Sequence, residues 1–156
     1  MMVAGDAAAR DAYLAGEPFA REGVWVRHAS HPFRIAPLPY QPLPTAGAVP
    51  ERMTHVVTIA EDAPGGSDRR AAARGPHMER VSPMAADGTL AVGGAILDES
   101  SGRMVGSIAV TAHADDAAAR AWMAEDPYVT GGVWRDVSLH GTRFAPLPYL
   151  PLPGAA

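Results

Sequence analysis

The stretch ADDAAARAWMAEDPYVTGGVWRDVSLHGTRFAPLPYLPLP, residues 114–153, occurs in this chain in two versions. The other version, AGDAAARDAYLAGEPFAREGVWVRHASHPFRIAPLPYQPLP, spans residues 4–44. A repeat spaced by about 110 residues is too long for a solenoid period. The pattern therefore indicates a partial tandem duplication, in which the first copy lacks the front half of a domain. The matching positions are Asp6 and Asp116, Arg10 and Arg120, Pro18 and Pro127, residues 23–25 and 132–134, and residues 36–40 and 145–149.

The size and composition are those of a globular protein. A chain of 156 residues predicts one domain, or one domain with an appendage. The net charge of −4 and the lack of a Lys/Arg cluster argue against a nucleic-acid surface. The chain has no cysteine, which excludes disulfides, thiolate metal sites and a cysteine nucleophile. We see no signal peptide and no run of about 18 apolar residues, so we expect a cytoplasmic protein without a membrane span.

The first copy predicts a short helix, a strand and an extended tail. Residues 6–15 are Ala-rich with an acidic residue near the start, which favours a helix, and Pro18 should end it. Residues 24–35 are typical of a strand with poor alternation. Residues 37–50 are rich in proline and predict an extended connector. This fragment is too small to fold alone, so it must dock on the rest of the chain, pair with another chain or fray.

The second part of the chain predicts a complete β-α-β-β-α-β unit. Its first helix should start with Ser67 as N-cap, and Gly75-Pro76 should kink it or divide it in two. Gly93-Gly94 indicates a bulge or a close approach by another group. The expected strands are residues 54–60, 89–97, 104–111 and 133–139, and the expected helices are residues 67–84 and a segment from Asp115 or Asp116 to just before Asp126.

This order predicts an α+β fold, a ferredoxin-like sandwich with its helices on one face of an antiparallel sheet. The other face needs a cover, which a second sheet from an identical chain would supply, so we expect a homodimer through the sheet face. The expected organisation is a partial repeat at 1–44, a linker at 45–52, a complete domain at 53–145 and a Pro-rich tail at 146–156.

The complete unit resembles the YciI-like (YCII-related) family, part of the dimeric α+β barrel group. The resemblance rests on Arg70 and Arg74-Gly-Pro-His77 on the first helix, Gly88-x4-Gly93-Gly94, Gly106-Ser107, and Asp126-Pro127-Tyr128. It covers residues 53 to about 146. One departure is Ala95, where relatives often carry proline after the paired glycines. Family members begin at the position of Met53, so the upstream residues are either a docked remnant of a tandem copy or a decaying or misassigned start.

The resemblance implies that His77 and Asp126 meet in a pocket as the catalytic pair. A carboxylate bonded to one ring nitrogen fixes the tautomer and makes the other nitrogen a general base. Arg74, one helical turn before His77, is positioned to bind an anionic substrate group, and Ser107 to contribute a hydroxyl. Considered alone, a helix histidine beside an arginine is more often a solvated surface residue.

The remaining histidines and the proline-rich tail carry weaker signals. His28, His31, His55, His113 and His140 have no metal-like spacing, so we expect no metal site and no cofactor. The first copy has Glu17 where the second has Asp126, but no helix with a partner histidine, so we expect one site. The tail after Ala145 is either a polyproline ligand for an aromatic groove or, as its duplication favours, a strap on this chain or its dimer mate.

Two hypotheses on function follow from this sequence. The first is an enzyme that uses His77 as general base, oriented by Asp126, in cofactor-free lyase or isomerase-type chemistry on a small cyclic or carbonyl-containing metabolite. The second is a non-catalytic dimeric module that binds a small anionic ligand through Arg74 and His77, or serves as a structural module. A pH–rate profile that depends on His77 would favour the first hypothesis.

Overall fold

A computed structural model describes residues 6–149 of the chain, which divide into two units, Met1–Ser30 and His31–Ala156. Residues 1–5 of the partial repeat and residues 150–156 of the Pro-rich tail lie outside the described residues. The division between units falls inside the partial repeat, not at its end near residue 44. The second half of the repeat is therefore part of the larger unit.

The smaller unit contains two short helices. Asp6 caps α1 (Ala7–Gly16) by accepting a hydrogen bond from the amide of Ala9. The expected helix is thus present, but α2 (Pro18–Arg21) was not expected. Glu17 ends α1 and also caps α2, whose first residue is the proline. Trp25 packs against Phe19 within this unit, with ring centroids 6.1 Å apart, and stays 39% exposed.

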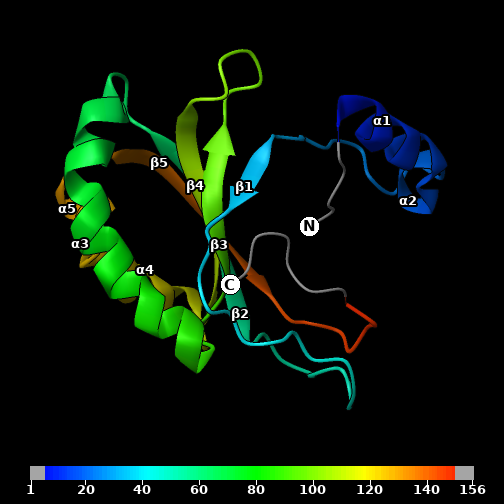
Figure 1. Ribbon diagram of the computed structural model, residues 1–156. Coiled ribbons are helices and arrows are strands. Elements are labelled where there is room, and N and C mark those ends of the chain that lie inside the picture. Colours follow the sequence, from blue (N-terminus) through cyan, green and yellow to red (C-terminus); the bar gives the residue numbers. More distant parts are fainter. Residues whose placement is uncertain (1–5, 150–156) are drawn as a thin grey trace. The chain divides into compact units, whose positions relative to one another are not determined.

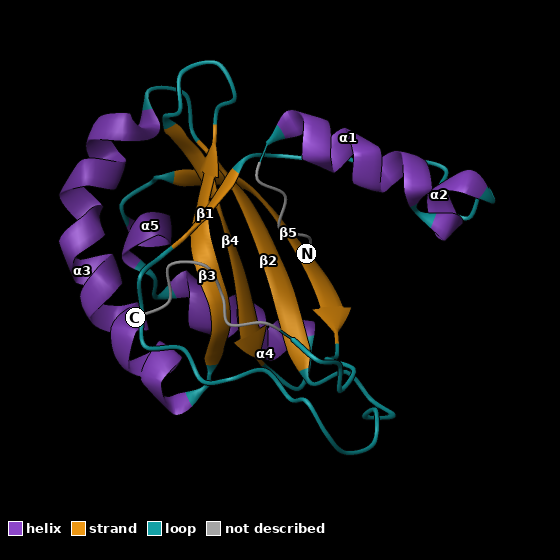
Figure 2. Ribbon diagram, turned by 45° about the vertical axis from the view of Figure 1, so that its right-hand side comes forward, coloured by secondary structure: helices purple, strands orange, loops and turns teal. Residues whose placement is uncertain are grey.

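The larger unit is an antiparallel sheet with three helices on one face (Figures 1 and 2). The strand order is β1-β3-β4-β2-β5, and all neighbouring strands are antiparallel. The elements are β1 (Phe33–Ile35), β2 (His55–Asp62), α3 (Gly66–Asp87), β3 (Leu90–Leu97), β4 (Met104–Ala112), α4 (Asp116–Ala124), α5 (Pro127–Thr130) and β5 (Trp134–Thr142).

Strand β2 explains how one sheet face becomes the core. Its residues alternate between buried and partly exposed, as a strand covered on one side requires. Val56, Thr58 and Ala60 are buried beneath the helices. Val57 and Ile59 point to the opposite face and keep intermediate exposure. The sheet therefore has a covered face and an open face.

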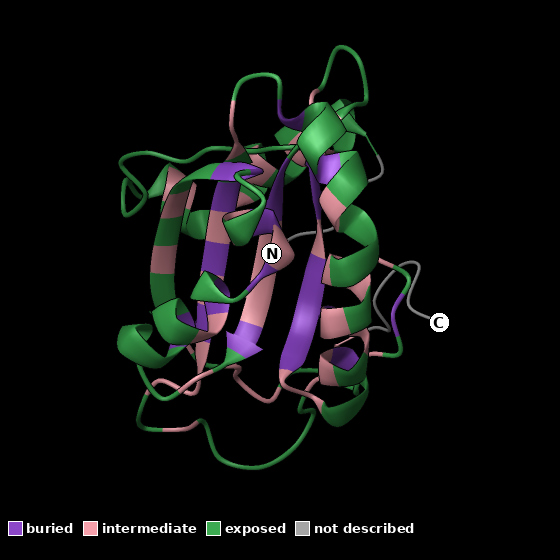
Figure 3. Ribbon diagram, turned by 90° about the vertical axis from the view of Figure 1, so that its left-hand side faces the viewer, coloured by how far each residue is buried: buried purple, intermediate pink, exposed green. Residues whose placement is uncertain are grey.

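Helix α3 is one continuous helix, so the expectation of two short helices is wrong. It curves around the sheet instead of breaking (Figure 1). Pro76 and Pro83 both lie on its exposed side, where water can satisfy the carbonyls that lose a donor. The N-cap is Gly65, in the left-handed region, not Ser67, which lies inside the first turn. Figure 3 shows much of α3 exposed, whereas the strands beside it carry most of the buried and intermediate segments.

The expected strand over residues 24–35 is reduced to Phe33–Ile35, which was not foreseen. These residues pair with β3, where Phe33 lies opposite Ile96 and Ile35 opposite Gly94. The last bond of the ladder joins the amide of Leu97 to the carbonyl of Pro32. Within residues 6–149 no strand pairs with residues 24–32, so the ladder with β3 begins at Phe33.

We call residues 33–40 the strap. It consists of β1 and the five residues that follow, which cross from β3 toward α3. The amide of Ala36 donates to the carbonyl of Gly93 at 2.9 Å, and the hydroxyl of Tyr40 donates to the same carbonyl at 2.8 Å. Leu38 is only 4% exposed and packs with Val81, Ala85 and Leu90. Burial, opposed by the Gly93 hydrogen bond, raises the pKa of Tyr40 to about 12.

The second copy of the same pentapeptide has a different environment. Leu147, the counterpart of Leu38, is 50% exposed. The hydroxyl of Tyr149 donates to the carbonyl of Ala145 inside its own segment. The same pentapeptide is thus buried in one copy and exposed in the other, because only the first copy lies beside the edge of β3.

The paired glycines mark a close approach, as the sequence indicated. A side chain at Gly94 would collide with the carbonyl of Arg34 and the ring of Phe33. We therefore expect Gly94→Ala to lower the free energy of unfolding by about 1–3 kcal/mol, because β1 would have to move away. Urea unfolding measures this loss, and hydrogen exchange should show reduced protection of the Ala36 amide.

The matched control is Gly75→Ala on α3, where an added Cβ meets no atom within 4 Å. Its stability should be unchanged or higher by up to about 1 kcal/mol, since alanine favours a helix over glycine. Equal stability and equal Ala36 protection in Gly94→Ala and the wild type would contradict the close approach.

Candidate functional site

The Asp126-Pro127-Tyr128 motif is a helix start that buries its carboxylate. Asp126 is the N-cap of α5 and accepts a hydrogen bond from the amide of Tyr128 at 2.8 Å. Pro127 occupies the first helical position, where its missing amide costs nothing. Asp126 is fully buried. The motif therefore fixes a carboxylate beneath α3.

His77 lies on the inner side of α3 and reaches this carboxylate. Its Nδ1 lies 2.9 Å from Oδ1 of Asp126 and 3.1 Å from Oδ2. The imidazole stacks on the ring of Tyr128, with centroids 3.9 Å apart and planes 15° apart. Trp134 meets it edge-on at 6.1 Å. The ring is thus held by the carboxylate on one nitrogen and by aromatic faces around it.

Arg80 helps to compensate the buried charge of Asp126. Its Nη1 lies 3.9 Å from Oδ2 of Asp126, and its Nη2 donates to the carbonyl of Trp122 at 2.8 Å. A buried carboxylate needs both hydrogen bonds and nearby positive charge to stay ionised. The amide of Tyr128, the imidazole of His77 and the guanidinium of Arg80 supply them.

A second buried ion pair supports the other end of the site. Arg70 donates to both carboxylate oxygens of Asp62, at 2.7 and 2.6 Å, and to the hydroxyl of Ser107 at 2.9 Å. Its guanidinium also lies 4.6 Å above the ring of Tyr128. Burial lowers the pKa of Arg70, but the hydrogen bonds and the charge of Asp62 outweigh this effect, so the pKa of Arg70 lies above its ordinary value. Trp134 donates its Nε1 proton to Ser107 as well.

These groups open into a cavity of about 390 Å³ between the sheet, α3 and the strap. His77, Arg74 and Ser107 all line it, as do Arg34 and Leu38 of the strap. Nδ1 of His77 is taken by Asp126, and among residues 6–149 no protein group bonds to Nε2. Nε2 is therefore the ring nitrogen that can accept a proton from a molecule bound in the cavity.

The structure brings together the residues proposed from the sequence and adds others. Arg74 is exposed at the cavity and forms no ion pair within residues 6–149. Ser107 already accepts from Arg70 and Trp134, so only its own proton remains to be donated. Sequence reasoning missed the pairing of Asp62 with Arg70 and the stacking of Tyr128. The helical spacing of Arg70 and His77, two turns apart, is a signal that would have placed both on one face.

Within the described residues, no group of three or more His, Cys, Asp or Glu side chains is arranged to hold a metal ion. Between residues 6 and 149, no helix combines the length and apolarity that crossing a bilayer requires.

The geometry predicts that neutral His77 carries its proton on Nδ1. In Asp126→Asn we expect a larger share of the Nε2-protonated tautomer, because a neutral amide is a weaker acceptor and its NH₂ group competes as a donor to Nδ1. Long-range ¹H–¹⁵N NMR of the imidazole reports the tautomer directly.

The matched control is Asp115→Asn, since Asp115 caps α4 as Asp126 caps α5 but forms no hydrogen bond to His77, and its charge acts on His113 instead. Asparagine is an equally good N-cap, so His77 should keep its wild-type tautomer there. An identical tautomer in the wild type and in Asp126→Asn would remove Asp126 as the orienting group.

Comparison with known proteins identifies the larger unit. Residues 53–141 match the family described as YCII-related domain. An uncharacterized protein of Haemophilus influenzae is 35% identical over 88 residues, which cover 53% of this chain and 90% of that protein. A solved structure is similar in fold, with a TM-score of 0.50 and 19% identity over 55% of this chain and 90% of the other. It is 5-chloro-2-hydroxyhydroquinone dehydrochlorinase (TftG) from Burkholderia phenoliruptrix AC1100 in complex with 2,5-dihydroxybenzoquinone. The resemblance found in the sequence is confirmed, and the chain belongs to the YCII-related domain family.

Proposed function

We propose that this protein is an enzyme in which His77 acts as a general base, oriented by Asp126, on a small cyclic or carbonyl-containing molecule. The observation that carries the proposal is the bond of 2.9 Å between Nδ1 of His77 and the fully buried carboxylate of Asp126. This contact leaves Nε2 without a protein partner among residues 6–149, in a cavity large enough for a small ligand.

The proposed step is a proton transfer without a cofactor. Nε2 of His77 takes a proton from a carbon next to a carbonyl group, and the C–H electron pair moves into the carbonyl to form an enolate. Asp126 stabilises the imidazolium that results. The proton then returns at another atom, or a leaving group departs with its electron pair. The similar fold of TftG, named a dehydrochlorinase, agrees with enzymatic chemistry on this scaffold but does not extend its substrate to this chain.

His77→Gln should abolish base catalysis. A panel of cyclic ketones and 2-oxo carboxylates in D₂O, followed by ¹H NMR, reports the exchange of acidic C–H protons. We expect the wild type to accelerate exchange of at least one compound, and His77→Gln to slow it by about 10²–10⁴-fold.

The control is His140→Gln, because His140 is exposed on β5, bonds to Ser138 and does not line the cavity. Its exchange rate should equal that of the wild type. Equal rates in His77→Gln and the wild type would contradict the proposal. Ligand binding without any exchange across the panel would favour the non-catalytic module instead.

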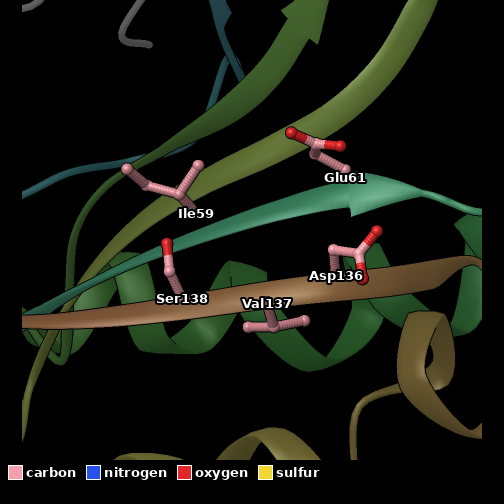
Figure 4. Close-up of a pocket in the computed structure, with 5 residues that line it drawn as sticks. All are labelled: Ile59, Glu61, Asp136, Val137 and Ser138. Carbon is pink, nitrogen blue, oxygen red and sulfur yellow. The ribbon is translucent and has the colours of Figure 1, made fainter. Parts of the chain in front are cut away.

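We further propose that the complete unit is a ferredoxin-like domain that pairs through its open sheet face in a homodimeric α+β barrel. Supporting this, the order β3-β4-β2-β5 is the one that split β-α-β connections generate. The open face carries Val57, Ile59, Ile108 and Val110 at intermediate exposure. Figure 4 shows Ile59, Glu61, Asp136 and Ser138 on one side of the sheet, with Val137 pointing to the other side.

Ile59→Arg tests the dimer. In a monomer the new cation has Glu61 and Asp136 close by, so the fold should persist. In a dimer the charge would be buried in the interface, so we expect a shift to monomer in sedimentation velocity. Ala72→Arg adds the same charge on the exposed side of α3 and should remain dimeric. A monomeric wild type would overturn this assembly.

We also interpret residues 4–44 as a partial duplicate of the unit's C-terminal part. The shared pentapeptide at residues 36–40 and 145–149 supports this interpretation. The fragment retains counterparts of the second helix, the last strand and the tail but has no counterpart of α3, so it carries no second site.

A further inference from the structure

We infer that the strap completes the His77 cavity and that Arg34, on the strap, binds an anionic group of the ligand. The inference deepens the proposed function, because it names the substrate class of the same site as small cyclic or aromatic anions. It assigns a binding role to a residue from the partial repeat, outside the segment that matches the family.

The sheet register directs Arg34 toward the site. Arg34 lies opposite Ala95 in β3, and Ala95 lies opposite Ser107 in β4. Residues in one cross-strand row share a face of the sheet. Ser107 is on the helix-covered face, bonded to Arg70. Arg34 therefore shares the helix-covered side with the catalytic pair, and it lines the same cavity as His77.

The charges of the cavity are not balanced. Arg34, Arg70 and Arg74 line it. Arg70 is neutralised by its bidentate pair with Asp62. Neither Arg34 nor Arg74 forms an ion pair within residues 6–149, and both are exposed to the cavity or solvent. The cavity therefore holds two uncompensated guanidinium groups, which favour an anionic ligand.

The other walls are apolar and of a size suited to one ring. A cavity of about 390 Å³ lies at the lower end of the range for small-molecule sites. An anionic ring would place its acidic group at the arginines and its apolar part on side chains that face it. These are Met78, Leu90, Trp122, Tyr128 and Trp134.

The same cations would also help the chemistry. Removal of a proton next to a carbonyl leaves negative charge on the ligand, and fixed donors aimed at that charge lower the barrier. Arg34 sits on a strap that is anchored by the Gly93 hydrogen bonds and by buried Leu38. Its backbone is thus fixed before the ligand arrives.

The internal repeat supplies matched controls. Arg143 occupies the position of Arg34 in the second copy, donates to the carbonyl of Glu51 and does not line the cavity. Leu147 is the exposed counterpart of buried Leu38. Each variant of the strap can therefore be compared with the same substitution at the matching position of the second copy.

The test titrates the full chain with benzoate, and with benzamide as the neutral isostere, and follows the imidazole signals of His77 by NMR. We expect benzoate to shift these signals and benzamide to shift them far less. Arg34→Gln should weaken benzoate binding at least about fivefold, whereas Arg143→Gln should stay within about twofold. Leu38→Asp should weaken it as well, because the strap would undock, and Leu147→Asp should not.

Equal benzoate affinity in Arg34→Gln and Arg143→Gln would overturn the role of Arg34. Equal responses to benzoate and benzamide, or no response to benzoate in the wild type, would overturn the anion site. The His77 tautomer is measured without ligand, so none of these outcomes changes that result. Failure of the anion site is therefore distinguishable from failure of His77 as the proposed base.

Discussion

The site depends on one buried carboxylate. Asp126 caps α5, accepts from the amide of Tyr128 and holds Nδ1 of His77, all with the same side chain. A buried charge tolerates few arrangements, because each oxygen must find donors. The position of α5, the packing of α3 against it and the orientation of the imidazole are therefore linked. The stacked Tyr128 extends the link to Arg70, and through Arg70 to Asp62 and the sheet.

The strap is the second constraint, and it acts through backbone more than through side chains. Its approach to β3 requires a glycine at position 94, since any Cβ there meets the carbonyl of Arg34. The hydrogen bonds to the Gly93 carbonyl and the burial of Leu38 then hold the strap in place between β3 and α3. A segment outside the family's domain thereby becomes a wall of the domain's cavity.

The duplicated pentapeptide shows how far context decides the fate of a sequence. Leu38 and Leu147 sit in the same Ala-Pro-Leu-Pro-Tyr context, yet one is 4% exposed and the other 50%. Local preference for an extended conformation is the same in both copies. The difference comes from the partner, because the first copy meets an edge strand and an apolar groove.

The sequence by itself indicated the β-α-β-β-α-β order of the complete unit, without the short helix α5, because periodicity and caps are local signals. The family resemblance, carried by short motifs, pointed to His77 and Asp126. The sequence also indicated a close approach at Gly93-Gly94, though not by what. The tertiary structure decided that the strand of the first copy shrinks to Phe33–Ile35, that α3 stays whole across Pro76, and that Asp62 pairs with Arg70. It also decided that Arg34 faces the cavity. Pairing at a sheet edge uses backbone groups that nearly every residue carries, so the sequence does not mark where it occurs. Contacts between segments distant in sequence produce no periodic pattern, so they could not be inferred from the residues alone.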